Sequence, residues 1–158
     1  MITLLDNTVL SNFAIIARPD WIRVALGDAA ATVEETFAEL QRGIALSRLP
    51  NADWTWLPVL HLDDSERVVF ERLRERLNAG EAACLSMASA RNYRVFTDDR
   101  DARAIALQMQ IPISGTLGLL LILVRKNYLS LEQANVALAQ MIAAGYHSPS
   151  PDLRDLNS

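Results

Sequence analysis

The sequence has few of the residues that build disulfides and soft-metal centres. Cys84 is the one cysteine among 158 residues, so an internal disulfide and a cysteine-based zinc site are both excluded. The two histidines, His61 and His147, are too few and too far apart in sequence to form a histidine cluster. We therefore expect the polar chemistry of this chain to depend on oxygen ligands.

Long apolar runs are also missing. The longest, from Leu117 to Val124, ends at Arg125 and is far shorter than the roughly 20 residues that span a bilayer, so it predicts a buried helix. Residues 1–10 have no basic region ahead of an apolar stretch and do not resemble a secretory signal. We expect a cytoplasmic protein with no membrane partner.

Positive charge is scarce as well. Lysine and arginine number 15 against 19 acidic residues, which gives a formal net charge of −4. Nucleic-acid-binding proteins normally use an excess of Lys and Arg, so this charge balance counts against a nucleic-acid-binding function. The objection weakens if several acids surround a divalent cation, because the cation inverts the local charge. A phosphate-binding loop is absent too, since residues 115–118 lack the P-loop lysine and the dinucleotide fingerprint.

What is present is an alternation of strand and helix patterns. With 51% hydrophobic residues, the chain can bury the core of one domain, expected at residues 1–147, followed by a loose C-terminal tail at 148–158. The alternation predicts an α/β fold, a three-layer α/β/α sandwich with a central, mainly parallel sheet. We expect strands at 2–5, 57–62, 93–97 and 111–115, with a weak candidate at 28–31, and helices at 9–17, 21–26, 33–42, 66–77, 81–90, 101–109, 117–126 and 131–144.

Acidic residues occur where these expected elements meet. Asp6 follows the first strand, Asp98 and Asp99 follow the strand at 93–97, and Glu81 begins a helix. The carboxyl ends of parallel strands share one sheet edge, which is where α/β folds bind ligands. Carboxylates gathered there repel one another unless a cation lies between them, and their oxygens suit Mg²⁺ or Mn²⁺. The sequence therefore predicts a metal-dependent enzyme that acts on phosphates.

Two of these acids also have a simpler explanation. Asp6 stands at a position where helix caps are common, and one of the pair Asp98 and Asp99 is expected to cap the next helix. Glu81 shares one helical face with the apolar Cys84 and Leu85, so we expect its carboxylate to point inward. It then needs a metal, a basic partner or the amides of its helix.

Glu39 is the acid that spacing does not select. On a helical wheel it lies beside Glu35 and away from Phe37 and Leu40, which indicates exposure to solvent. Glu35 is assigned to a capping box that begins at Thr32, which leaves Glu39 free for another role.

The acids lie in four short segments: DNTVL at 6–10, ELQRG at 39–43, GEAA at 80–83 and TDDRDAR at 97–103. These segments resemble the Asp-x-Ser/Thr-x-Leu, Glu-Leu-x-x-Gly, Gly-Glu-Ala-Glu and Thr-x-Asp/Asn patterns of the PIN-domain family of metal-dependent ribonucleases, in particular the small prokaryotic branch related to the toxins of toxin–antitoxin modules. The resemblance covers almost the whole chain, with two departures: Asn7 replaces a small hydroxyl residue and Ala83 replaces a glutamate.

The resemblance implies a PIN-like fold and an endoribonuclease that hydrolyses RNA phosphodiester bonds with Mg²⁺ or Mn²⁺. Asp6 and Asp99 are then the most direct metal ligands, Glu39 and Glu81 complete the catalytic set, and Asp98 is a further metal-ligand candidate. A divalent ion supplies the chemistry by lowering the pKa of a bound water and neutralising phosphate charge. Further residues are candidates for orienting the ligands or contacting the substrate: Thr8, Thr97, Arg100 and Arg103.

The same resemblance implies a homodimer and a toxin role with a small antitoxin partner. The antitoxin would cover an apolar groove that contains Phe13, Trp21 and Ile22. Two alternatives stay open. One is a catalytically weak or inactive PIN-fold module with a nucleic-acid-binding or regulatory role, suggested by the acidic net charge and Asn7. The other is a phosphatase with Asp6 as nucleophile, although position 8 is Thr rather than a second Asp and no convincing lysine partner is present.

Overall fold

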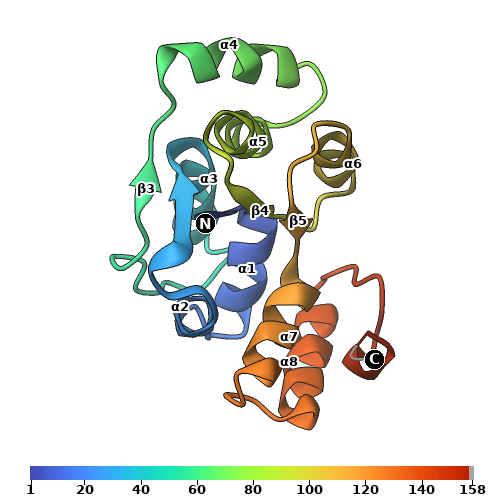
Figure 1. The fold of residues 1–158 in the computed structure, drawn as a ribbon. Coiled ribbons are helices and arrows are strands. Elements are labelled where there is room, and N and C mark those ends of the chain that lie inside the picture. The colour runs from blue at the N-terminus through green and yellow to red at the C-terminus, as the bar shows by residue number, and fades with distance from the viewer. Residues whose placement is uncertain (157–158) are drawn as a thin grey trace.

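The computed structural model describes residues 1–156 and places a five-stranded sheet at the centre of the molecule (Figure 1). All paired strands run parallel, in the order β3-β2-β1-β4-β5. The α/β class and the parallel sheet predicted from the alternating pattern are confirmed. The strands are β1 (Thr3–Leu5), β2 (Ala30–Val33), β3 (Val59–Leu60), β4 (Arg94–Phe96) and β5 (Ile113–Ser114).

Helices connect the strands and cover both faces of the sheet. They begin within about two residues of the predicted starts, because caps are local signals, whereas the helix predicted to end at 42 continues to Ala45 and the helix predicted to end at 77 stops at Leu73. The helices are α1 (Asn7–Ile15), α2 (Asp20–Leu26), α3 (Glu34–Ala45), α4 (Asp64–Leu73), α5 (Ala79–Arg91), α6 (Arg100–Gln108), α7 (Thr116–Arg125) and α8 (Leu131–Ala143), with 3₁₀ turns η1 (Gly27–Ala29) and η2 (Leu153–Asp155).

Two apolar cores lie on opposite faces of the sheet, because successive strand residues point in opposite directions. Leu5 and Phe96 belong to the core with α1, α2, α7 and α8, whereas Leu4 and Val95 belong to the core with α4, α5 and α6. Figure 1 shows these two groups of helices above and below the sheet. The predicted three-layer arrangement is therefore confirmed.

The start of α3 corrects one prediction. Thr32 and Val33 lie in β2, and the Thr32 hydroxyl donates to the Leu5 carbonyl at 2.7 Å instead of capping a helix. α3 begins at Glu34 and has no side-chain cap. Two β-branched residues fit a buried parallel strand, and pairing with β1 outweighs the local capping pattern. Glu35 is consequently not part of a capping box.

α5 is surrounded by protein, and its small residues allow neighbours to approach closely. Residues 80–88 are all buried, so the helix has no single inward face. A Cβ added to Gly80 would lie 2.7 Å from Thr36 Oγ1 and 2.9 Å from Glu39 Oε1. Thr36 Oγ1 is also 3.7 Å from Cys84 Sγ. This close packing of α3 on α5 brings the side of α3 that carries Glu39 toward the sheet edge.

The C-terminal segment differs from the predicted loose tail. Leu153 of η2 is fully buried, and its N–H donates to Asn135 Oδ1 on α8 at 2.8 Å. Asn135 also donates to Asp152 at 2.9 Å. The segment therefore packs on α8 as far as residue 156, and residues 157–158 of the predicted tail lie outside the described residues. Among residues 1–156, no helix combines the length and apolar character needed to cross a bilayer.

The apolar groove expected on the early helices does not form as predicted. Phe13 and Ile22 are fully buried in the core shared with α7 and α8, so neither side chain is available to a partner. Trp21 is partly exposed, with the Arg18 guanidinium 5.7 Å from its ring centroid. α2 contacts α7 and α1 contacts α8, so the apolar side chains of the early helices pack against those of the last two helices.

Candidate active site

Parallel pairing brings the ends of β1 and β4 to the same level. Leu5 pairs with Phe96, so Asp6 and Thr97 are the next residues at the carboxyl edge of the sheet. The strand order also reverses here, with β2 and β3 beyond β1 and β5 beyond β4. Such a switch point is where α/β folds open a crevice for ligands.

Asp6 lies at the centre of this edge and is 2% exposed. Its Oδ2 accepts hydrogen bonds from the hydroxyls of Thr97 at 2.8 Å and Thr8 at 3.2 Å. The side chain makes no cap for α1, so helix capping does not explain Asp6. Burial raises the pKa of Asp6 to about 6, hydrogen bonds from Thr97 and Asn7 oppose the rise, and the charge of Glu39 adds to it.

Thr8 and Thr97 hold Asp6 in place. Each hydroxyl donates its proton to Asp6 and accepts a backbone N–H from the turn before α6: Thr8 from Asp98 at 2.9 Å, Thr97 from Asp99 at 3.1 Å. Thr97 is 1% exposed. Of the two roles considered from sequence, orienting an acidic residue fits this geometry, and substrate contact by Thr97 does not.

Glu81 reaches the same edge from the first turn of α5. Its Oε2 accepts the backbone N–H of Asn78 at 3.2 Å, and Asn78 Oδ1 accepts the Glu81 N–H at 2.9 Å, so the pair forms a capping box. The pKa of Glu81 is raised to about 7, first by burial and then by the negative charges of Asp6 and Asp99. Glu81 is therefore held by its own helix and repelled by neighbouring acids.

Asp99 is the N-cap of α6, with Oδ1 accepting the Ala102 N–H at 2.8 Å. The negative charge of Asp99 is among the causes that raise the pKa of Glu81, after burial and the charge of Asp6, so these two carboxyl groups interact. The expectation that one acid of this pair caps the next helix is therefore correct for Asp99, and the cap uses one of its two carboxylate oxygens.

Glu39 is partly buried and turned toward α5, not exposed as the helical wheel indicated. Its Oε1 accepts the Gly80 N–H at 3.2 Å, and its charge contributes to the raised pKa of Asp6. Glu39, Glu81 and Asp99 thus each interact with another acid of the predicted set.

Asp98 is turned away from the other acids. Its Oδ1 accepts the Thr116 N–H at 2.9 Å and the Tyr146 hydroxyl at 3.4 Å. Its Oδ2 accepts the Thr116 hydroxyl at 2.5 Å and the Asn12 amide at 3.2 Å. Both oxygens therefore fasten the start of α7 and the closing segment to β4. Its predicted role as a metal ligand remains a prediction.

The two predicted substrate arginines lie on α6. Arg103 Nη1 donates to the Thr97 carbonyl at 2.9 Å, which ties this side chain to the strand end. Arg100 is exposed in the first turn of α6. Arg103 is therefore engaged in holding the site, while Arg100 is open to solvent.

Glu35 is an acid that the sequence argument set aside. Its Oε2 is buried and has no hydrogen-bond partner among the described residues. Burial is the main cause that raises the pKa of Cys84, and the charges of Asp6, Glu35 and Glu39 add to the rise, so Glu35 belongs to the same acidic region. The i, i+4 spacing of Glu35 and Glu39 predicted that both lie on one face of α3, and the wrong step was to expect that face to be exposed to solvent.

The donor chemistry of this region fits a divalent cation. Among residues 1–156, none of the four acids Asp6, Glu39, Glu81 and Asp99 forms an ion pair with Lys or Arg, and Glu35 leaves a buried oxygen unpartnered. Yet no group of three or more His, Cys, Asp or Glu side chains within 1–156 is arranged to hold a metal ion. The physical reason is that several of these carboxylates turn to backbone N–H groups of α5 and α6, so an ion would have to draw them together.

Comparison with known proteins supplies a family. A family model described as a PIN domain matches residues 2–156, a span that contains the whole sheet and every acid of the site. Comparison with curated proteins gave no match, and comparison with solved structures gave none.

Proposed function

The chain belongs to the PIN-domain family, and from this premise we propose that it is a metal-dependent endoribonuclease that hydrolyses RNA phosphodiester bonds. PIN domains are generally nucleases and typically use divalent metal ions. The proposed active site consists of Asp6, Glu39, Glu81 and Asp99, with Mg²⁺ or Mn²⁺ as the cofactor.

The observation that carries this proposal is the mutual repulsion of the acids at the β1–β4 edge. Burial is the largest cause of the raised pKa of both Glu81 and Asp6. The charges of Asp6 and Asp99 raise the pKa of Glu81 as well, and the charge of Glu39 raises that of Asp6. A fold gains nothing from placing unpaired carboxylates together, because each destabilises the ionised form of the next. A divalent cation removes this unfavourable interaction, which supports a metal-binding role.

The chain's own residues would position the ligands. Thr8 and Thr97 fix Asp6, and the caps of α5 and α6 fix Glu81 and Asp99. A bound Mg²⁺ or Mn²⁺ would lower the pKa of a water and neutralise charge on the phosphate oxygens. In the metal-free protein the pKa of Asp6 is about 6, so below that pH a cation competes with a proton for this carboxylate.

The test is cleavage of single-stranded RNA by the purified chain in Mg²⁺ or Mn²⁺. We expect activity that EDTA abolishes and that Asp6→Asn lowers by about 100-fold or more, since the loss of a residue that only supports a metal ligand already costs about 10- to 100-fold. Asp101→Asn, an exposed position on α6, is the matched control. Cleavage that survives Asp6→Asn unchanged would show that the site is elsewhere.

A second candidate function is a PIN-fold module that binds nucleic acid or regulates without turnover. The specific observation in its favour is that the carboxylates of Glu81 and Asp99 already serve as helix caps and are not arranged around an ion. Saturable divalent-ion binding without cleavage of varied RNAs would favour this function. The aspartyl phosphatase gains no support, because the hydroxyl of Thr8 is occupied in holding Asp6.

We further propose that the chain is the cytoplasmic toxin of a toxin–antitoxin pair and acts as a homodimer. The support is the resemblance of its motifs to that branch of the family. A short reading frame beside the gene whose product copurifies with the chain and blocks cleavage would support the pair. A single-chain mass in light scattering would contradict the homodimer.

A further inference from the structure

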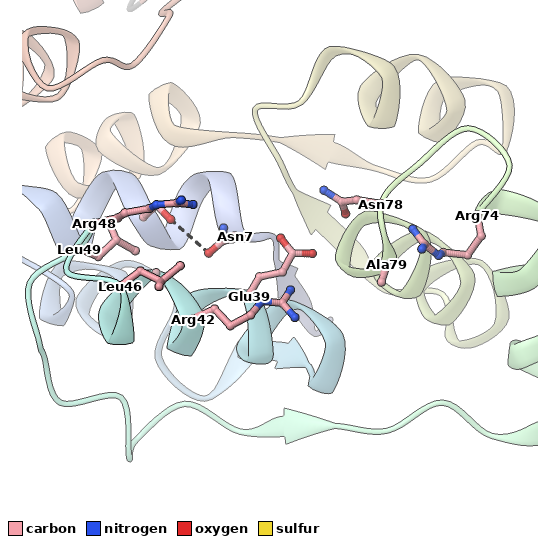
Figure 2. A pocket seen from close by; sticks show the side chains of 11 residues that line it. Asn7, Glu39, Arg42, Leu46, Arg48, Leu49, Arg74, Asn78 and Ala79 are labelled. Atoms are coloured by element: carbon pink, nitrogen blue, oxygen red, sulfur yellow. Dashed lines mark hydrogen bonds between the residues drawn. The ribbon is translucent and has the colours of Figure 1, made fainter.

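A groove of about 610 Å³ adjoins the acids on the side of α3 (Figure 2). Asn7 lies on its α1 side, Glu39 on α3, and Asn78 at the start of α5. Figure 2 shows the Glu39 carboxylate between Asn7 and Asn78, so the groove opens directly from the proposed active site.

The charge of the groove is opposite to that of the chain. Its ionisable lining residues are Arg42, Arg48 and Arg74 against the single acid Glu39, whereas the chain as a whole carries −4. Within residues 1–156, none of the three arginines forms an ion pair with an acid. Arg74 does donate to the Leu77 carbonyl at 3.0 Å, which steadies it on the α4–α5 loop.

The arginines occupy two walls. Arg42 and Arg48 belong to α3 and the loop after it, and Arg74 follows α4 on the other side, as Figure 2 shows. Arginine is suited to this position because its planar guanidinium binds phosphate oxygens in pairs. No aromatic side chain lines the groove, so it offers no surface for stacking bases.

Asn7 adds a neutral donor where the groove meets Asp6. Its Oδ1 accepts a hydrogen bond from Ser11 Oγ at 3.1 Å, which directs the amide. Its Nδ2 has no hydrogen-bond partner among residues 1–156 and is available to a ligand oxygen. This gives a physical role to the residue that departs from the family pattern.

We propose that this groove binds the sugar-phosphate backbone of an RNA strand beside the cleaved bond, with Arg42, Arg48 and Arg74 on the phosphates and Asn7 on an oxygen next to the acids. The inference rests on the proposed function, because it names the path of that enzyme's substrate. Contacts to phosphate alone make the binding insensitive to base sequence and sensitive to salt.

The test is equilibrium binding of a fluorescent oligouridylate to the full chain, measured by anisotropy in EDTA so that no cleavage occurs. Each of Arg42→Gln, Arg48→Gln and Arg74→Gln should weaken binding roughly 3- to 10-fold near 100 mM salt. Each should also reduce the slope of log K against log salt by about 0.7, the value for one phosphate contact on a single strand. Arg72→Gln, at an exposed position on α4 outside the groove, is the matched control and should do neither.

Asn7→Ala separates hydrogen bonding from charge. It should weaken binding about 2- to 5-fold without changing the salt slope, because it removes a neutral donor. Circular dichroism and thermal unfolding of every variant show whether a loss of binding reflects a loss of fold.

The outcomes separate this inference from the proposed function. A triple variant combines Arg42→Gln, Arg48→Gln and Arg74→Gln. If the wild type cleaves RNA but this triple variant binds oligouridylate as tightly as Arg72→Gln does, the groove proposal is overturned and the nuclease stands. If binding depends on the three arginines but no divalent ion supports cleavage, the nuclease fails and the groove stands. If a polyglutamate peptide binds through the same arginines and oligouridylate does not bind, the groove serves an acidic protein segment and the RNA path is wrong.

Discussion

Replacing Asp6 by asparagine should stabilise the metal-free protein at neutral pH while abolishing RNA cleavage. The Asp6 side chain is 2% exposed, and its Oδ2 accepts hydrogen bonds from Thr8 and Thr97. Asparagine has nearly the same shape, and its Oδ1 can accept both hydrogen bonds. The substitution therefore keeps the packing and removes a buried charge that has no cationic partner.

The magnitude follows from the pKa. Asp6 is raised from 3.8 to about 6, and each pKa unit corresponds to about 1.4 kcal/mol. The ionised carboxylate therefore lowers the free energy of unfolding by on the order of 3 kcal/mol. The new amide N–H₂ must be buried as well, which costs about 1–3 kcal/mol. A net gain of up to about 2 kcal/mol remains, or up to roughly 8 °C in Tm for a chain of this size.

The gain should depend on pH in a defined direction. The unfolded chain releases the Asp6 proton near pH 3.8 and the folded protein near pH 6. Between these values the folded protein binds more protons, so wild-type stability falls as pH rises. Below about pH 4 both states are protonated and the variant has no advantage from charge. Above about pH 7 the advantage is complete.

Urea unfolding in EDTA from pH 4 to pH 8 measures this difference, with Asp101→Asn as the exposed control. Adding Mg²⁺ at pH 8 should raise the Tm of the wild type and leave that of Asp6→Asn unchanged. A variant that is less stable than the wild type at pH 8, or a difference that does not vary with pH, would refute the reasoning that burial and neighbouring charge destabilise ionised Asp6.

Three further substitutions test one buried ion pair, which joins Arg91 at the far end of α5 to Glu66 on α4, and two positions beside the site. Arg91→Leu should lower the free energy of unfolding by about 3–5 kcal/mol, because the Glu66 carboxylate, paired at 2.7 Å, has a fully buried side chain; a loss below 1 kcal/mol in urea would contradict this. Gly80→Ala puts a methyl 2.9 Å from Glu39 Oε1 and should weaken divalent-ion binding in calorimetry about 10-fold; unchanged affinity would show that this carboxylate does not take part. Asp98→Asn should cost about 1–3 kcal/mol of stability and leave divalent affinity unchanged, and a large loss of affinity would restore this residue to the metal ligands.

The residues at the strand ends were predictable, because their signal is local. An apolar run followed by Asp6 or by Asp98 and Asp99 marks a strand that ends at a polar edge, and parallel pairing places these ends together. Sequence could not tell Asp98 from Asp99 by physics alone. Their roles separate only because Thr116 and Tyr146, far along the chain, occupy the oxygens of Asp98.

The capping patterns show where local reasoning failed. Thr32 and Glu35 have the spacing of a capping box, but the first is part of a buried strand. Asn78 and Glu81 have the same kind of spacing and do form one, which agrees with the helix amides that were one of the three partners expected for Glu81. The two cases look alike in sequence. The difference is that residues 30–33 pair with β1, and this contact with a distant segment is not visible in the local pattern.

By itself the sequence determined the order of the elements and the presence of acids at the carboxyl ends of β1 and β4. The tertiary structure alone decided that Glu39 faces α5 instead of solvent, that one carboxylate oxygen of Glu35 is buried, and that three arginines share one groove. Periodicity and capping depend on residues within a turn or two, whereas these features depend on how closely α3 packs against α5 at Gly80, and no local pattern encodes that approach.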